Sequence, residues 1–220
     1  MVFYLFKCRL LSSPYNPHIF HHETVSMNTL FITGVTGFLG GAVLEKILTG
    51  NRTCNLLLLA RAATPEEGLE RVKANMRKFN IQEHELNTLK TDNILIGDLA
   101  DPDGFIQDPR LDKVTHVLNS AAVASFGNNP LIWKVNVEGT LALARRMEQV
   151  AGLQRFLHVG TAMSCTPEQD AVVAESAEFR ENAEHLVEYT RSKSTIEQLM
   201  RQECPAVSYT HLTLPTICSV

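Results

Sequence analysis

A tyrosine and a lysine stand four residues apart in the segment EYTRSKSTIEQL, which has the pattern of a helix. At that spacing, Tyr189 and Lys193 project from the same side of a helix. A free tyrosine titrates at about pH 10, and an ammonium within about 4–6 Å can lower that pKa by about 1–3 units. The pair therefore predicts a phenol activated for proton transfer; the alternative is an exposed pair on an amphipathic helix.

Other polar candidates lie upstream of this pair. The segment FLHVGTAMSC is expected to end a buried strand, so that Thr161 and Ser164 face the same crevice as the tyrosine. Thr161 is suited to donate a hydrogen bond to a substrate carbonyl and to stabilise its developing oxyanion. Asn136 lies midway along an expected helix, where asparagine is a poor helix former. It serves either a proton relay or the bracing of the sheet.

The segment TGVTGFLG places three glycines between an expected strand and an expected helix. Gly34 permits a tight turn, Gly37 lets the backbone approach a pyrophosphate, and Gly40 lets the helix pack closely against the strand. The helix N-terminus then offers free N–H groups and a positive dipole end to the anion. We therefore expect a dinucleotide in this loop, where its other predicted contacts are Thr36, Phe38 and Leu39.

The residues after the second expected strand indicate which dinucleotide binds. An acid usually holds the adenosine ribose hydroxyls there, but the run LLLLARA ends at Arg61 and no acid precedes it. A guanidinium can clamp a 2′-phosphate, which an acid would repel. Arg61, with Arg71 as a second candidate, favours NADP(H) over NAD(H), and the alternative for both arginines is a solvated surface charge.

Two further segments are expected at the same edge of the sheet. In GDLADP, Asp98 is suited to accept the adenine amino group and Leu99 to pack against the ring, or else the aspartate caps a helix. In LNSAAVA, the small residues Ala121 and Ala122 allow the cofactor to come close. Lys193 can also hold the nicotinamide ribose hydroxyls.

Short apolar runs alternate with longer helical patterns, which predicts an α/β domain with a Rossmann-type, doubly wound parallel sheet over residues 27–206. Helices are expected over 37–50, 64–79 and 130–151, with a capping box that starts at Thr64. The expected strands are TLFIT, NLLLLA, NILIG, THVLN and RFLHV.

Both ends of the chain depart from this pattern. Residues 1–26 mix aromatics, histidines and prolines without a period, so we expect Met27 to be the natural start; a disordered extension is the alternative. Residues 207–220 include VSYTHLTLPT, which looks like a translated sequencing adapter. We expect an artefactual tail that truncates the domain before its C-terminal substrate-binding region, and a real short C-terminus is the alternative.

Composition excludes some function classes. The chain of 220 residues has a net charge of −4 and no basic run, so nucleic acid is not expected as a partner. Its five cysteines show no metal-like spacing, so we expect no metal, free thiols and a cytoplasmic location. No apolar stretch approaches the roughly 20 residues that would span a bilayer.

The motifs at Thr33–Gly40, Asp98, Thr161 and Tyr189–Lys193 together resemble the extended short-chain dehydrogenase/reductase superfamily. The segments GFLG, LARAATPEEGLERV, GDLADPDGF, NVEGT and HVGTA are similar to its thioester reductase and fatty acyl-CoA reductase branch, the male-sterility-type NAD-binding branch. The resemblance implies Thr161, Tyr189 and Lys193 as the catalytic triad. It also implies reduction of a CoA- or carrier-bound acyl thioester by NADPH, with Tyr189 protonating the oxyanion beside the nicotinamide.

Other interpretations stay open at this point. Gly160 stands where that branch usually carries a serine, and a chain that stops early need not be active by itself. A sugar-nucleotide epimerase or dehydratase on the same scaffold is the alternative enzyme, although Arg61 argues against its tightly held NAD. A third alternative is a sensor or scaffold that binds NADPH without turnover. An acyl carrier and a homodimer are open as partners, as is membrane association.

Overall fold

The computed structural model describes residues 27–50, 53–161, 184–205 and 209–211. Its strands form one sheet in the order β3-β2-β1-β4-β5-β6, and every neighbouring pair is parallel. The predicted runs are confirmed to within one residue at either end, because continuous apolar runs suit strands that are buried on both faces. The corresponding strands are β1 (Thr29–Thr33), β2 (Asn55–Ala60), β3 (Ile94–Ile96), β4 (His116–Asn119) and β5 (Arg155–His158).

The sixth strand, β6 (Tyr209–His211), pairs in parallel with β5 at the edge of the sheet. It lies within residues 207–220, which the sequence analysis separated from the domain. The rest of that segment beyond 211, and all of residues 1–26, lie outside the described residues. The expectations about both ends therefore stay predictions.

The first two predicted helices are present as α1 (Phe38–Leu48) and α2 (Pro65–Arg77). The Thr64 hydroxyl caps α2 by accepting a hydrogen bond of 3.2 Å from the Glu67 amide. The Glu67 carboxylate, however, accepts from the Ala63 amide at 2.9 Å, one residue earlier than a capping box requires. Four short elements were not predicted, because three to five residues are too few for a hydrophobic period to repeat: α3 (Glu83–Leu86), η1 (Thr91–Asn93), η2 (Pro102–Gly104) and η3 (Pro109–Lys113).

The third predicted helix is continuous, but its middle is a π-helix. A Cβ atom at Gly139 would overlap the Leu99 carbonyl, so the helix passes very close to the loop after β3. Such π-helical turns are frequent at functional sites. The helix consists of α4 (Leu131–Trp133), η4 (Lys134–Gly139) and α5 (Thr140–Glu148), and the last helix of the described chain is α6 (Glu188–Glu203).

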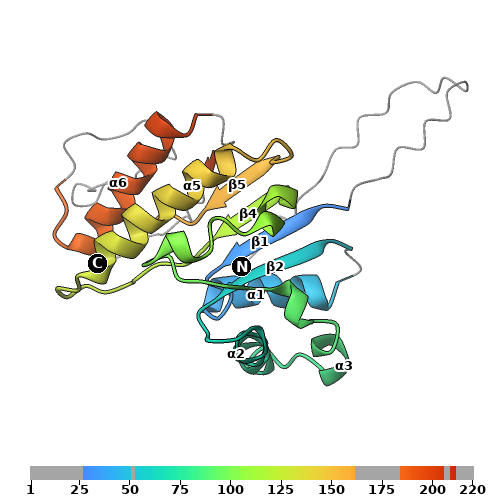
Figure 1. Cartoon of the computed structure of the whole chain (residues 1–220). Coiled ribbons are helices and arrows are strands. Elements are labelled where there is room, and N and C mark those ends of the chain that lie inside the picture. Colours follow the sequence, from blue (N-terminus) through green and yellow to red (C-terminus); the bar gives the residue numbers. More distant parts are fainter. Residues whose placement is uncertain (1–26, 51–52, 162–183, 206–208, 212–220) are drawn as a thin grey trace, which may run out of the picture.

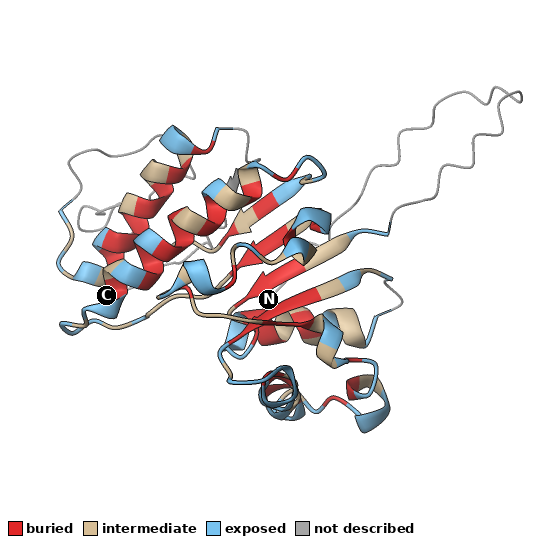
Figure 2. Cartoon of the chain, in the orientation of Figure 1, coloured by how far each residue is buried: buried red, intermediate tan, exposed pale blue. Residues whose placement is uncertain are grey.

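Helices cover both faces of the sheet (Figure 1). Successive strand residues point to opposite faces, so Phe31 packs into one apolar cluster and Ile32 into the other. The Phe31 cluster includes side chains of α5 and α6, and the Ile32 cluster includes side chains of α1 and α2. Figure 2 shows the buried residues concentrated in the strands and on the helix sides that face them. The prediction of a doubly wound Rossmann-type sheet is confirmed.

The strand order reverses at one place along the sheet, between β1 and β4. The chain runs outward from β1 through β2 to β3, and then returns to place β4 on the other side of β1. Phe31 of β1 is opposite Leu57 of β2 on one side and Val117 of β4 on the other. Ligands of open parallel sheets bind at the carboxyl ends of the strands where the order reverses. The segments that follow β1 and β4 meet at that point.

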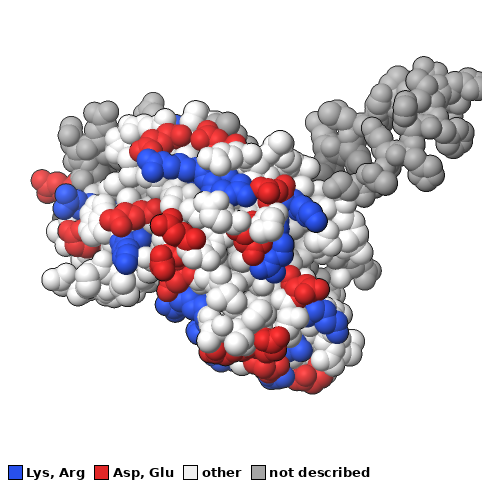
Figure 3. Space-filling view, viewed as in Figure 1, with Lys and Arg blue, Asp and Glu red and all other residues white. Residues whose placement is uncertain are grey.

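Charged side chains of both signs are interspersed on the face shown in Figure 3. Within the described part of the chain, no helix combines the length and the apolar character needed to cross a membrane.

Candidate active site

The glycine loop after β1 has the geometry that the sequence predicted. Gly34 has a φ of +71°, and a Cβ atom there would lie 2.6 Å from the Ala121 amide nitrogen. A Cβ atom at Gly40 would overlap the Gly34 carbonyl, so only glycine lets α1 pack this closely against the turn. Gly37 caps α1 and is exposed, as are the other predicted loop contacts, Thr36, Phe38 and Leu39.

A buried amide on α2 holds this loop in place. The Asn75 side chain donates hydrogen bonds to the carbonyls of Val35, at 3.2 Å, and Gly37, at 3.3 Å. A Cβ atom at Gly41 would lie 2.7 Å from the same amide nitrogen. Sequence reasoning missed Asn75. The one hint in the local sequence is that Asn75, a polar residue, lies on the same side of α2 as the buried residues Val72 and Met76.

Side-chain hydrogen bonds also join the ends of β1 and β4. The Thr33 hydroxyl donates to the Asn119 side-chain oxygen at 2.5 Å and accepts from the Ala121 amide at 3.2 Å. The Ser120 hydroxyl donates to the Thr33 carbonyl at 2.7 Å. These contacts hold the segment with Ala121 and Ala122 beside the glycine loop, where both alanines are partly exposed. The sequence analysis identified the alanines and missed the polar residues that position them.

Three charged residues were predicted to bind the adenosine half of the cofactor. They lie together near the ends of β2 and β3. A guanidinium nitrogen of Arg61 is 3.8 Å from a carboxylate oxygen of Asp98, and the Arg61 side chain is 67% exposed. The Arg71 guanidinium donates to the Arg61 carbonyl. Asp98 also accepts from the Ala100 amide at 2.9 Å, so it stabilises a local turn as well. An exposed ion pair of this kind costs little to open for a ligand.

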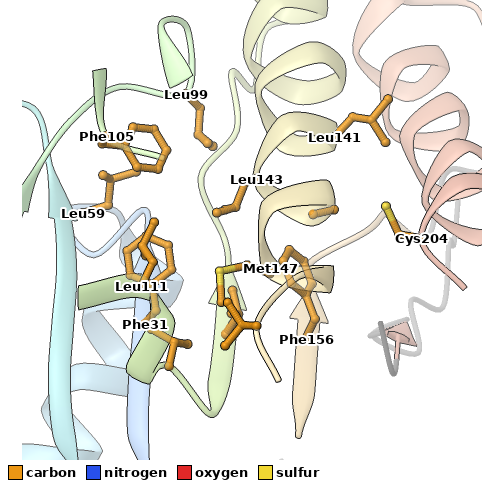
Figure 4. Close-up of a cluster of buried hydrophobic side chains, with 14 of the residues drawn as sticks. Phe31, Leu59, Leu99, Phe105, Leu111, Leu141, Leu143, Met147, Phe156 and Cys204 are labelled. Atoms are coloured by element: carbon orange, nitrogen blue, oxygen red, sulfur yellow. The ribbon is translucent and has the colours of Figure 1, made fainter. Parts of the chain in front are cut away.

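The structure contradicts the expected role of Leu99. Its side chain is 2% exposed and lies among the core residues of the Phe31 cluster, close to Phe105 (Figure 4). Asp98 and Leu99 lie in a tight turn after β3, where the Asp98 carboxylate stays partly exposed and the Leu99 side chain turns into the core. Leu99 is therefore a core residue and is not placed to pack against an adenine ring.

The tyrosine and the lysine lie on α6 at the same edge of the sheet. Tyr189 is half-buried, and its ring meets the Phe126 ring edge to face, with 5.9 Å between the centroids. Lys193 is 3% exposed, and its ammonium donates a hydrogen bond of 2.8 Å to the carbonyl of Val159, just after β5. The alternative of an exposed surface pair is therefore wrong.

The electrostatic effect expected of this pair is a second correction. Burial raises the pKa of Tyr189 above its ordinary value, whereas the sequence analysis expected a neighbouring ammonium to lower it. Burial also lowers the pKa of Lys193 to about 8. The Lys193 ammonium is directed to the Val159 carbonyl, and desolvation dominates the environment of the phenol. Tyr189 is consequently protonated at neutral pH, which suits a proton donor.

Three other candidates were predicted near this pair. Thr161 follows β5 and is partly exposed, and Ser164 lies outside the described residues. Asn136, in the π-helical turn, accepts from the Val123 amide at 2.7 Å and donates to the Val123 carbonyl at 3.1 Å. It also donates to the Ser192 hydroxyl at 3.1 Å. Of its two expected roles, the structure shows bracing, because Asn136 ties the segment after β4 to α6.

A doubly wound sheet with a glycine loop and a buried Tyr-x-x-x-Lys pair defines a dinucleotide-binding domain of the short-chain dehydrogenase/reductase type. The chain belongs to the NAD-binding family described as male sterility protein, whose model matches residues 32–213. The resemblance seen in the sequence is thereby confirmed.

Individual relatives agree with this assignment. The chain is 28% identical over 202 residues to fatty acyl-CoA reductase 8 of Arabidopsis thaliana, covering 80% of this chain and 40% of that protein. A reductase domain of a nonribosomal peptide synthetase from Mycobacterium tuberculosis has a TM-score of 0.60 and 25% identity, covering 82% of this chain and 45% of that one. The terminal R domain of the myxalamid PKS-NRPS pathway has the same fold, with a TM-score of 0.69 and 19% identity. The match covers 86% of this chain and 48% of that one. The chain thus spans less than half the length of each of these proteins.

Proposed function

We propose that this chain is the cofactor-binding part of an NADPH-dependent reductase that converts an acyl thioester, bound to CoA or to an acyl carrier, into an aldehyde. The observation that carries the proposal is the placement of a protonated, half-buried phenol, Tyr189, at the sheet edge that also holds the glycine loop. The fatty acyl-CoA reductase and the synthetase reductase domain among its relatives support a thioester as the substrate.

The glycine loop fits a dinucleotide. Its close backbone approaches leave no room for side chains at Gly34 and Gly40, and the N-terminus of α1 offers its amide groups to a pyrophosphate. Arg61 and Arg71 would hold the 2′-phosphate of NADPH at the end of β2. The same arginines argue against the NAD-retaining epimerase or dehydratase alternative.

Three side chains divide the chemistry of the reduction. When bound, the nicotinamide supplies a hydride to the thioester carbonyl carbon. Tyr189 gives its phenolic proton to the resulting oxyanion, and Thr161 donates a hydrogen bond to the same oxygen. Lys193 would hold the nicotinamide ribose and would keep a positive charge behind the phenol. The hemithioacetal then expels the thiol and leaves the aldehyde.

The test is NADPH oxidation with a panel of acyl-CoA thioesters, carried out on the chain and on its Tyr189→Phe variant. We expect the variant to lose at least about a hundredfold in rate, because general acid catalysis contributes roughly 10²–10⁴-fold. NADPH binding, followed by its fluorescence, should be unchanged. Conversion of a nucleotide sugar by a protein purified with bound NAD would instead establish the epimerase alternative. NADPH binding without turnover of any thioester, both in this chain and in a protein of the relatives' full length, would instead support a sensor or scaffold.

A cytoplasmic location, a homodimer and an acyl carrier as thioester donor are part of the same proposal. Sedimentation of the purified chain and reduction of a carrier-bound acyl group test the last two.

A further inference from the structure

An exposed phenylalanine lies directly against the proposed proton donor. Phe126 is 68% exposed, in the segment that follows β4. Its ring meets the Tyr189 ring at an interplanar angle of 66°, an edge-to-face arrangement. Aromatic pairs prefer this geometry over direct stacking, so the contact fixes the relative orientation of the two rings. Most of the Phe126 surface is exposed to water, so this side chain adds little to the hydrophobic core. Its main contribution is the ring contact with Tyr189.

A chain of hydrogen bonds links the backbone segments that carry the two rings. Asn136 binds both the amide and the carbonyl of Val123, three residues before Phe126. Asn136 also donates to the Ser192 hydroxyl, which donates in turn to the Tyr189 carbonyl at 2.7 Å. The backbone that carries Phe126 and the backbone that carries Tyr189 are therefore tied to the same buried amide.

We propose that Phe126 is a positioning residue, whose ring holds the Tyr189 hydroxyl in the orientation needed for proton transfer. This inference rests on the proposed function. A phenol can turn about its side-chain bonds, and an error of about 1 Å in the placement of a reacting group can cost about a hundredfold in rate. A second ring against the phenol restricts that rotation without touching the substrate oxygen.

Phe126 acts through packing and solvation rather than through charge. Its segment, residues 120–129, has no titratable side chain, and neither do Val159, Gly160 and Thr161 at the end of β5. A substitution at Phe126 therefore leaves the charged groups around Tyr189 in place. Among the described residues, the titratable groups of the neighbouring elements are Glu188, Arg191 and Lys193 on the first turns of α6, Glu184 and His185 just before it, and Lys134 and Glu138 on the η4 turn that packs against it.

The kinetic test compares Phe126→Ala, Phe126→Tyr and the control Leu131→Ala, which truncates another exposed apolar residue outside the site. We expect the alanine variant to lose about tenfold in kcat with an unchanged KM for the acyl thioester. The tyrosine variant keeps a ring and should restore kcat, and the control should match the unsubstituted chain. A raised KM with an unchanged kcat would overturn the proposal, because Phe126 would then be only a substrate contact.

A titration that needs no turnover separates this inference from the proposed function. The tyrosinate absorbance of Tyr189 is obtained as the difference between each protein and its Tyr189→Phe counterpart. Burial raises the pKa of Tyr189, so removal of the Phe126 ring should lower that pKa toward the ordinary value. An unchanged titration overturns the inference even if kcat falls. If neither the unsubstituted chain nor a protein of the relatives' full length reduces any thioester, the proposed function fails, while this measurement still shows whether the Phe126 ring shields the Tyr189 hydroxyl from water. Phe126→Leu, which keeps bulk and removes the ring, replaces the alanine variant if that variant does not fold.

Discussion

The Lys193 ammonium donates a hydrogen bond of 2.8 Å to the carbonyl of Val159, and this contact ties the start of α6 to the end of β5. Lys193 is 3% exposed, and burial lowers its pKa to about 8. A lysine that is buried in a helix–sheet interface loses its hydration, and one carbonyl replaces only part of it. Lys193 therefore links α6 to the end of β5 and also makes the stability of the fold depend on pH.

We expect the free energy of unfolding to gain a contribution from Lys193 as the pH rises from about 8 to 10.5. In that window the unfolded lysine still binds a proton that the folded protein has released, so a rise in pH favours the folded state. The gain is at most about 3.5 kcal/mol, at about 1.4 kcal/mol per pKa unit. Lys193→Met should lack it, which urea unfolding of both proteins at several pH values would measure.

Cys204 is a second buried group whose titration affects that measurement. Burial, with a smaller contribution from Glu148, raises the pKa of its thiol to about 11. Its contribution therefore opposes that of Lys193, since the unfolded thiol loses its proton first as the pH rises. Both proteins contain Cys204, so its effect cancels in their difference. Parallel stability curves for the two proteins would show that the folded lysine has an ordinary pKa.

Arg61→Ala should weaken the binding of NADPH and leave that of NADH unchanged. The Arg61 side chain is exposed at the end of β2 and is paired only weakly with Asp98, so it is available to a 2′-phosphate. Loss of a charge-assisted hydrogen bond costs about 1.5–3 kcal/mol, or roughly 10- to 100-fold in the dissociation constant. Fluorescence titration with both dinucleotides measures this. Lys46→Ala removes an exposed cation at the far end of α1 and serves as the control. Equal weakening for NADPH and NADH would rule out a 2′-phosphate contact.

Gly40→Ala should destabilise the domain and impair dinucleotide binding together. The added methyl group would overlap the Gly34 carbonyl, and overpacking of this kind costs roughly 1–3 kcal/mol. Gly104→Ala is the matched control, because no heavy atom lies within 4 Å of the position that its Cβ would take. We expect urea unfolding to separate the two variants clearly. Similar stability and similar NADPH binding would contradict the packing role of Gly40.

Asn136→Leu should destabilise the domain by about 2–4 kcal/mol. The substitution leaves the partly buried amide and carbonyl of Val123 without their side-chain partner; a fully buried unsatisfied group costs about 1–3 kcal/mol, and these two groups cost less than the upper end because water reaches them in part. Asn129→Ala is the control, since Asn129 only caps the Leu131 amide and should cost about 1 kcal/mol. Hydrogen exchange at the Val123 amide should accelerate in the first variant and not in the second. Slow exchange in both would show that the brace is dispensable.

Local sequence pattern was enough to predict the scaffold. The strands are short apolar runs because both of their faces are buried, and such runs stand out from the helical segments between them. The glycine roles could also be predicted, because the positive φ of Gly34 and the contact of Gly40 with the Gly34 carbonyl both arise within a few residues of chain. The spacing of Tyr189 and Lys193 placed both on one side of a helix for the same reason.

Contacts between distant segments decided the rest of the site. Asn75, Asn119 and Asn136 each hold backbone or side chains that lie 13 or more residues away, and the sequence singled out only Asn136, without deciding its role. Only the packed structure places Leu99 in the core and Asp98 at the surface. The same holds for the pKa of Tyr189. Sequence supplies the neighbouring ammonium, but burial sets the direction of the shift, and burial depends on how α6 packs against the sheet and how near Phe126 lies.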